Sequence, residues 1–100
     1  MMQHRHFLAL AYSEDGGYGV VFPDIPGCVA EGGTLDDALG AASHVLAFHL
    51  DAARTDGETM PQPRSYEQLV AADTDADDWW DWDGAIVAAV APRPAEEAAE

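Results

Sequence analysis

The stretch FPDIPGCVAEGGTLDDAL, residues 22–39, decides how this chain folds. Two prolines and three glycines lie in its first twelve residues, and a helical pattern begins directly after them. Pro26 and Gly27 suit the central positions of a type II turn, because proline presets the first φ angle and glycine accepts the positive φ of the second. Thr34 suits the N-cap of a helix whose first turn carries negative charge. The stretch therefore predicts two corners, one between strands and one between a strand and a helix.

Strand patterns lie on both sides of the first corner. Residues 5–12 and 18–22 are apolar and rich in strand-forming residues, and the loop SEDGG between them predicts a β-hairpin. Pro23 ends the second strand because proline has no N–H to donate to a sheet. Residues 28–32 resume as a third strand, which Gly33 breaks. These three segments predict an antiparallel meander.

Helical spacing follows the second corner. Apolar residues recur every three or four positions from residue 35 to about residue 55, which predicts one long amphipathic helix with Gly57 as its stop. Ser65, with Gln68 three residues later, predicts a capping box for a short helix over residues 66–72. The short apolar run at residues 85–91 predicts a buried strand that returns to the sheet beside the first strand.

The element order is therefore β-β-β-α-α-β, and the predicted class is an α+β, two-layer sandwich with a meander plus a returning last strand. One hundred residues suffice for one domain. We expect this domain to span residues 1–91. Residues 92–100 are expected to form a disordered acidic tail, and no C-terminal DNA-binding domain is expected.

The charge balance limits the partners. The chain has 19 acidic residues against 4 basic ones, with a net charge of −15. Such a surface repels phosphates, so we expect no direct binding to nucleic acid, whereas a basic protein would be attracted. Solubility, a salt-adapted source or a compositional bias are the alternative explanations of the charge. The apolar run near the N-terminus is too short for a signal peptide or a membrane span, which favours a cytoplasmic protein without membrane contact.

A family resemblance rests on the motif in and around residues 22–39. The matching residues are Phe22, Pro23, Asp24, Ile25, Pro26, Gly27 and Cys28, then Gly33, Thr34, Asp36, Asp37 and Ala38, and later Pro61, Pro63 and Ser65. This pattern, over roughly residues 5–72, resembles the HicB family of antitoxins. The resemblance implies a partial ribonuclease H-like fold and a partner of the HicA type, a small basic ribonuclease that cleaves mRNA. Many members of that family also carry a C-terminal DNA-binding segment, for which residues 92–100 offer no counterpart.

The residues predict no enzyme. Two-metal nuclease chemistry needs converging carboxylates on rigid strands, and residues 5–12 contain none. His4 and His6 point the same way on a strand but lack a third metal ligand. Cys28 is the single cysteine and suits a small core position. We therefore expect no catalytic residue, no metal site and no cofactor. For Asp24, hydrogen bonding to nearby backbone N–H groups is favoured over a partner contact.

The segment DDWWDWDG contains the candidate interface residues. These are the tryptophans Trp79, Trp80 and Trp82 and the aspartates Asp77, Asp78 and Asp81. Aromatic side chains rimmed by charge are typical anchors of interfaces, and the aspartates suit a basic partner. The alternatives are that the tryptophans cover the domain's own core or mediate self-association.

Two functions follow from these patterns. The first is an antitoxin domain that neutralises a basic HicA-like toxin by occlusion. The alternative is an orphan oligomeric structural or interaction domain without toxin or catalytic activity. In either case we expect a homo-oligomer, a dimer or a tetramer, because a thin sheet leaves edges to protect.

Overall fold

The two corners predicted within residues 22–39 both form in the computed structural model, which describes residues 6–72 and 82–93. Gly27 takes a φ of +91°, and the Cys28 N–H donates to the Ile25 carbonyl at 3.0 Å, as a type II turn requires. At the second corner the Thr34 side chain accepts a hydrogen bond from the Asp37 N–H at 3.0 Å. These two corners carry the chain from one strand to the next and then into the long helix.

The described residues form four strands and two helices in the predicted order. The strands are β1 (Phe7–Glu14), β2 (Gly17–Val21), β3 (Val29–Gly32) and β4 (Ile86–Val90), and the helices are α1 (Leu35–Thr55) and α2 (Tyr66–Ala72). All neighbouring strands are antiparallel, in the sheet order β3-β2-β1-β4. The predicted α+β class, the meander and the return of the last strand beside the first are confirmed. The expectation that this last strand is buried is wrong, because β4 lies at the edge of the sheet with Ile86, Val87 and Ala89 exposed. The first strand ends two residues later than expected, because the hairpin turn is confined to Asp15 and Gly16, and it begins at Phe7 rather than at residue 5.

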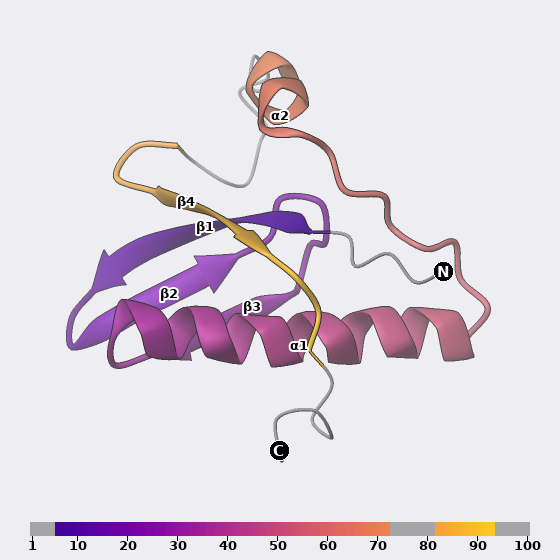
Figure 1. Ribbon diagram of the computed structural model, residues 1–100, viewed down its shortest axis with the longest axis horizontal. Coiled ribbons are helices and arrows are strands. Elements are labelled where there is room, and N and C mark those ends of the chain that lie inside the picture. The colour runs from indigo at the N-terminus through magenta and orange to yellow at the C-terminus, as the bar shows by residue number, and fades with distance from the viewer. Residues whose placement is uncertain (1–5, 73–81, 94–100) are drawn as a thin grey trace.

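The two faces of the sheet have separate apolar clusters. Side chains of Phe7, Ala9 and Ala11 alternate to one face and pack with α1, together with Val20, Phe22, Ala30, Ala38, Ala42 and Leu46. On the opposite face Leu10 packs with Leu69 of α2. Figure 1 shows the result, with α1 along one side of the sheet and α2 on the other. The sequence predicted the layer formed by α1 but did not assign α2 to a face.

Caps form at the end of α1 and at the start of α2. Beyond α1, Gly57 takes a φ of +74°, the Gly57 N–H donates to the Arg54 carbonyl and the Glu58 N–H to the Ala53 carbonyl, which is a Schellman motif. The predicted capping box of α2 also forms. The Gln68 N–H donates to Ser65 Oγ at 3.1 Å, and the Ser65 N–H donates to Gln68 Oε1 at 2.8 Å.

The residues after β4 are held against α1. The Ser43 hydroxyl donates to the Ala91 carbonyl at 2.8 Å, and the Arg93 N–H donates to the Ser43 carbonyl at 3.1 Å. Pro92 and Arg93, the first two residues of the expected tail, thus continue the packed structure, while residues 94–100 lie outside the described residues. Within residues 6–72 and 82–93, neither helix has the length and apolar character needed to cross a membrane.

Candidate partner-binding surface

Asp24 ties the first corner to the segment that leads into α2. Its carboxylate accepts hydrogen bonds from the Arg64 backbone N–H at 2.7 Å and from Arg64 Nε at 2.6 Å. The Asp24 side chain is 6% exposed and that of Arg64 is 41% exposed, so this ion pair is largely shielded on the acidic side. The partner lies forty positions along the chain, whereas the sequence favoured a nearby backbone N–H. We call the Asp24–Arg64 pair the clamp. It holds the chain just before α2 against the first corner.

Two features of the sequence point to the Asp24–Arg64 pair, although the sequence did not predict it. Asp24 lies between Pro23 and Pro26, and Arg64 follows Pro63, so both residues sit where the backbone is stiff. Arg64 is also one of only four basic residues in a chain of 19 acids. A buried aspartate requires a charged or hydrogen-bonding partner, and few candidates are present.

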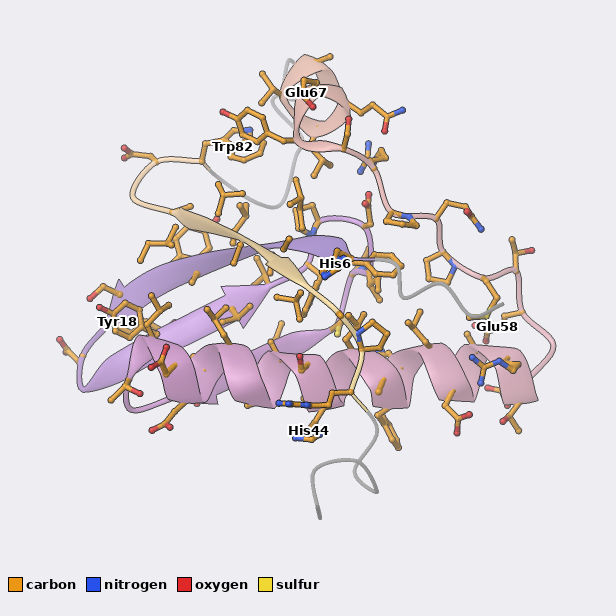
Figure 2. All side chains as sticks on the ribbon, in the orientation of Figure 1. His6, Tyr18, His44, Glu58, Glu67 and Trp82 are labelled. Atoms are coloured by element: carbon orange, nitrogen blue, oxygen red, sulfur yellow. The ribbon has the colours of Figure 1, made fainter. Side chains whose placement is uncertain are left out.

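Trp82 lies in what we call the Trp82 corner, formed by Tyr66, Leu69, Val70 and Trp82. Figure 2 shows Trp82 beside α2, on the side of the sheet opposite to α1. Its ring is partly buried against the Leu10–Leu69 cluster and meets the Tyr66 ring edge-on, with centroids 5.5 Å apart. Tyr66 and Val70 are exposed on α2. Trp82 therefore belongs to the apolar cluster of this face, and the corner still presents apolar side chains to solvent.

The other candidate interface residues cannot be placed on this corner. Trp79, Trp80, Asp77, Asp78 and Asp81 lie outside the described residues. Trp82 precedes the last strand rather than joining it, because the turn in which the Ala85 N–H donates to the Trp82 carbonyl comes before Ile86. The remaining five residues stay predictions from the sequence.

A second feature is an acidic hollow at the hairpin end of the sheet. It is lined by Glu14, Asp15, Gly16, Gly17, Tyr18, Glu31, Gly32 and Gly33. Three carboxylates lie around it, and its glycines expose backbone rather than side chains. Position 32 requires glycine, because a Cβ there would overlap the backbone of Asp37 and Ala38 at the start of α1. The hollow suits a cationic side chain of a partner by its charge.

Two chemical features of the described residues bear on the expected absence of a catalytic or metal site. Burial raises the pKa of the Cys28 thiol to about 11, so this thiol stays protonated at neutral pH and is a poor nucleophile. Within residues 6–72 and 82–93, no three side chains of His, Cys, Asp or Glu come together as a metal site. The features that stand out are surfaces, namely the Trp82 corner and the acidic hollow.

Comparison with known proteins decides the family. The model of the HicB-like antitoxins of bacterial toxin–antitoxin systems matches residues 7–97, almost the whole chain. The chain belongs to this family. The resemblance drawn from the proline and glycine corners is thereby confirmed.

Curated relatives agree over shorter spans. An uncharacterised 14.9 kDa protein of Haemophilus phage HP1 is 37% identical over 54 residues, which is 54% of this chain and 41% of that protein. Antitoxin HicB 1 of Photorhabdus laumondii is 37% identical over 59 residues, which is 59% of this chain and 38% of that protein. The HicB-like chain thus spans about two fifths of the length of the curated relatives it matches.

Solved structures share the fold. The N-terminal domain of Burkholderia pseudomallei antitoxin HicB is 28% identical, with a TM-score of 0.63 over 85% of this chain and 94% of that one. A chain of a toxin–antitoxin complex from Streptococcus pneumoniae has a TM-score of 0.71 at 24% identity, over 94% of this chain and 72% of that one. The observed fold is therefore that of the N-terminal domain of HicB antitoxins.

Proposed function

We propose that this chain is an antitoxin domain that binds a small basic HicA-type ribonuclease and blocks its access to mRNA. The family match over residues 7–97 carries this proposal. It is supported by similar folds in chains from a HicA3–HicB3 complex and from the Streptococcus pneumoniae complex. The net charge of −15 suits a partner that itself binds RNA, because such a partner needs a positive surface.

In this proposal the acidic surface and the apolar corner have different tasks. The carboxylates of Glu14, Asp15 and Glu31 attract cationic side chains and speed the encounter. Exposed Tyr66 and Val70 supply apolar area that slows dissociation once water is excluded. Trp79, Trp80, Asp77, Asp78 and Asp81 remain candidates for the same interface, with the tryptophans expected to contribute more than any single aspartate.

The test uses a basic ribonuclease of about 60 residues encoded next to this chain, since toxin and antitoxin are expected as neighbours. We expect the chain to bind it and to stop its cleavage of RNA at a stoichiometric ratio. Changing Glu14→Gln and Glu31→Gln together should weaken binding about tenfold, which is about 1.4 kcal/mol. Binding is measured by isothermal titration calorimetry, and inhibition by RNA cleavage.

The matched control removes one acid elsewhere. Asp51 lies on the exposed side of α1, where its carboxylate pairs with Arg54. Asp51→Gln should leave the affinity within about twofold, because an isolated exposed charge contributes little. Absence of binding at micromolar concentration, with RNA cleavage undiminished, would contradict the antitoxin role and favour an orphan oligomeric domain.

The proposal also covers activities that we expect the chain to lack. It assigns the chain no catalytic action on nucleic acid, no direct binding to DNA or RNA, and a place in the cytoplasm. Metal-dependent RNA cleavage by the purified chain, abolished by one acidic substitution, would contradict the first of these statements.

A further inference from the structure

The helix α2 leaves part of its own side of the sheet uncovered. Its seven residues make a helix about 10 Å long, whereas the four strands span about 14 Å across the sheet and β1 alone extends about 26 Å. The buried contact of α2 is Leu69, which packs on Leu10 of β1. At the far edge of the sheet from β4, Val29 of β3 is 55% exposed. In the described part of the chain, the β2–β3 half of this side is therefore a sheet face without a covering helix.

The strand register defines which side chains this half presents. On the α2 side of the sheet Val21 is opposite Val29, and two residues along each strand Gly19 is opposite Glu31. Glu14 of β1 projects to the same side, and its carboxylate occupies the space that a Cβ on Gly19 would fill. This half therefore has an apolar end and an acidic end. We call it the open sheet face, defined by Val21, Val29, Glu14 and Glu31.

The two carboxylates of the open sheet face are neighbours without a cationic partner among the described residues. The ion pairs found there involve other acids, Asp24 and Asp51. Like charges on adjacent strands of one face repel each other, so the placement of Glu14 beside Glu31 costs stability. A cationic side chain seated between the two carboxylates would remove this cost.

The exposed side of α1 offers apolar area with little uncompensated acidic charge. Phe48 is 72% exposed, and residues 38–50 of the helix include no acid. The next acid along the helix, Asp51, is paired with Arg54 at 3.0 Å, and the backbone of Arg93 is bonded to the same helix. A basic partner would therefore gain little attraction beside Phe48. Figure 1 shows that α1 and α2 lie on opposite sides of the sheet, so the charge distinguishes two opposite surfaces.

We propose that the basic toxin docks on the open sheet face, with an arginine or lysine side chain seated between Glu14 and Glu31 and apolar side chains against Val21 and Val29. This inference rests on the proposed function and adds the face of the chain on which the toxin docks. Covering the valines removes apolar area from water, and the bound cation ends the repulsion between the carboxylates. The exposed side of α1 stays free in the complex.

The chain offers a matched pair of substitutions for the test. Val29→Lys and Phe48→Lys each replace an exposed apolar side chain with the same positive charge, on opposite sides of the sheet. We expect Val29→Lys to weaken toxin binding at least tenfold, because the new charge repels a basic partner and the apolar contact is lost. Phe48→Lys should change the affinity by less than about threefold, the general effect of one added charge. Calorimetry measures both affinities, and thermal melting verifies that both variants are folded.

Chemical labelling of carboxylates in the unaltered chain is the second measurement, which depends on no variant. Glu14, Glu31 and Glu58 are all exposed, and Glu58 lies beyond the end of α1. A carbodiimide with an added amine should label all three in the free chain. With the toxin bound, labelling of Glu14 and Glu31 should fall at least fivefold, whereas that of Glu58 should stay unchanged.

The outcomes separate this inference from the proposed function. Toxin that binds and is inhibited, but whose affinity suffers more from Phe48→Lys than from Val29→Lys, would leave the antitoxin role intact and overturn the docking face. Full labelling of Glu14 and Glu31 in the complex would do the same. Failure of the unaltered chain to bind the toxin would contradict the proposed function and the docking face together.

Discussion

Asp24 shows how one buried charge joins parts of the chain that are distant in sequence. Its carboxylate receives two hydrogen bonds from Arg64, one from the backbone and one from the guanidinium. Hydrogen bonds to charged groups are stronger than neutral ones, and a buried carboxylate that loses its partners keeps its desolvation cost. The clamp should therefore contribute measurably to stability.

We expect Asp24→Asn to lower the free energy of unfolding by roughly 1–3 kcal/mol, because the charge-assisted bonds to Arg64 are lost. The same substitution at Asp51 is the matched control, since the Asp51–Arg54 pair is exposed on both sides. Asp51→Asn should cost less than about 0.5 kcal/mol. Urea unfolding followed by circular dichroism gives both values, and equal effects of the two substitutions would show that the clamp contributes no more than a surface pair.

The sequence predicts single residues well where their effect is local. Gly27 in the turn, Thr34 at the helix start and Ser65 with Gln68 all act within three positions, and the structure confirms each of them. The clamp between Asp24 and Arg64 was missed because its partners are forty positions apart. No periodicity links such a pair, and only the folded chain brings the two residues together.

At the scale of elements, the length of a helix decides whether its packing face can be predicted from the sequence. The 21 residues of α1 give six turns of apolar repeat, enough to identify the face that packs on the sheet. The seven residues of α2 give two turns and no clear stripe, so its side of the sheet could not be predicted. Its placement depends on Leu69, which is fully buried against Leu10, and on the Trp82 ring beside them.

The anchoring of α2 yields a test of its own. Leu69→Ala should lower the free energy of unfolding of the α2 region by about 2–5 kcal/mol, the usual cost of removing a buried leucine side chain. Val70→Ala is the control on the same helix, because Val70 is exposed and its truncation removes little buried area. Hydrogen exchange resolved by residue should show faster exchange in α2 than in α1 for Leu69→Ala, and no such difference for Val70→Ala. Uniform loss of protection over both helices would mean that α2 unfolds only together with the sheet.

At the scale of the whole molecule, the candidate site was only partly predictable from the sequence. The acidic composition predicts a basic protein partner and stays a prediction, whereas Trp82 does lie against the apolar cluster beside α2. The acidic hollow was not foreseen, because Glu31 comes from β3 while Glu14 and Asp15 come from the hairpin. Strand pairing brings these residues together. Which acidic residues become neighbours depends on the register of the strands, and the composition of the chain does not determine it.

Salt should act in opposite directions on the two associations expected for this chain. The Debye length is about 10 Å at 0.1 M salt and about 3 Å at 1 M, so added salt screens exposed charges at both interfaces. Screening removes attraction between the acidic surface and a basic toxin, and we expect toxin affinity to fall at least tenfold between about 0.1 M and 0.5 M NaCl. Screening also removes repulsion between two copies that each carry a charge of −15, so self-association should strengthen over the same range.

Calorimetry with the toxin and light scattering of the chain alone measure the two trends in matched buffers. A toxin affinity that does not respond to salt would show that apolar contacts dominate that interface, and a mass near the 10.7 kDa monomer at high salt and high concentration would exclude the homo-oligomer.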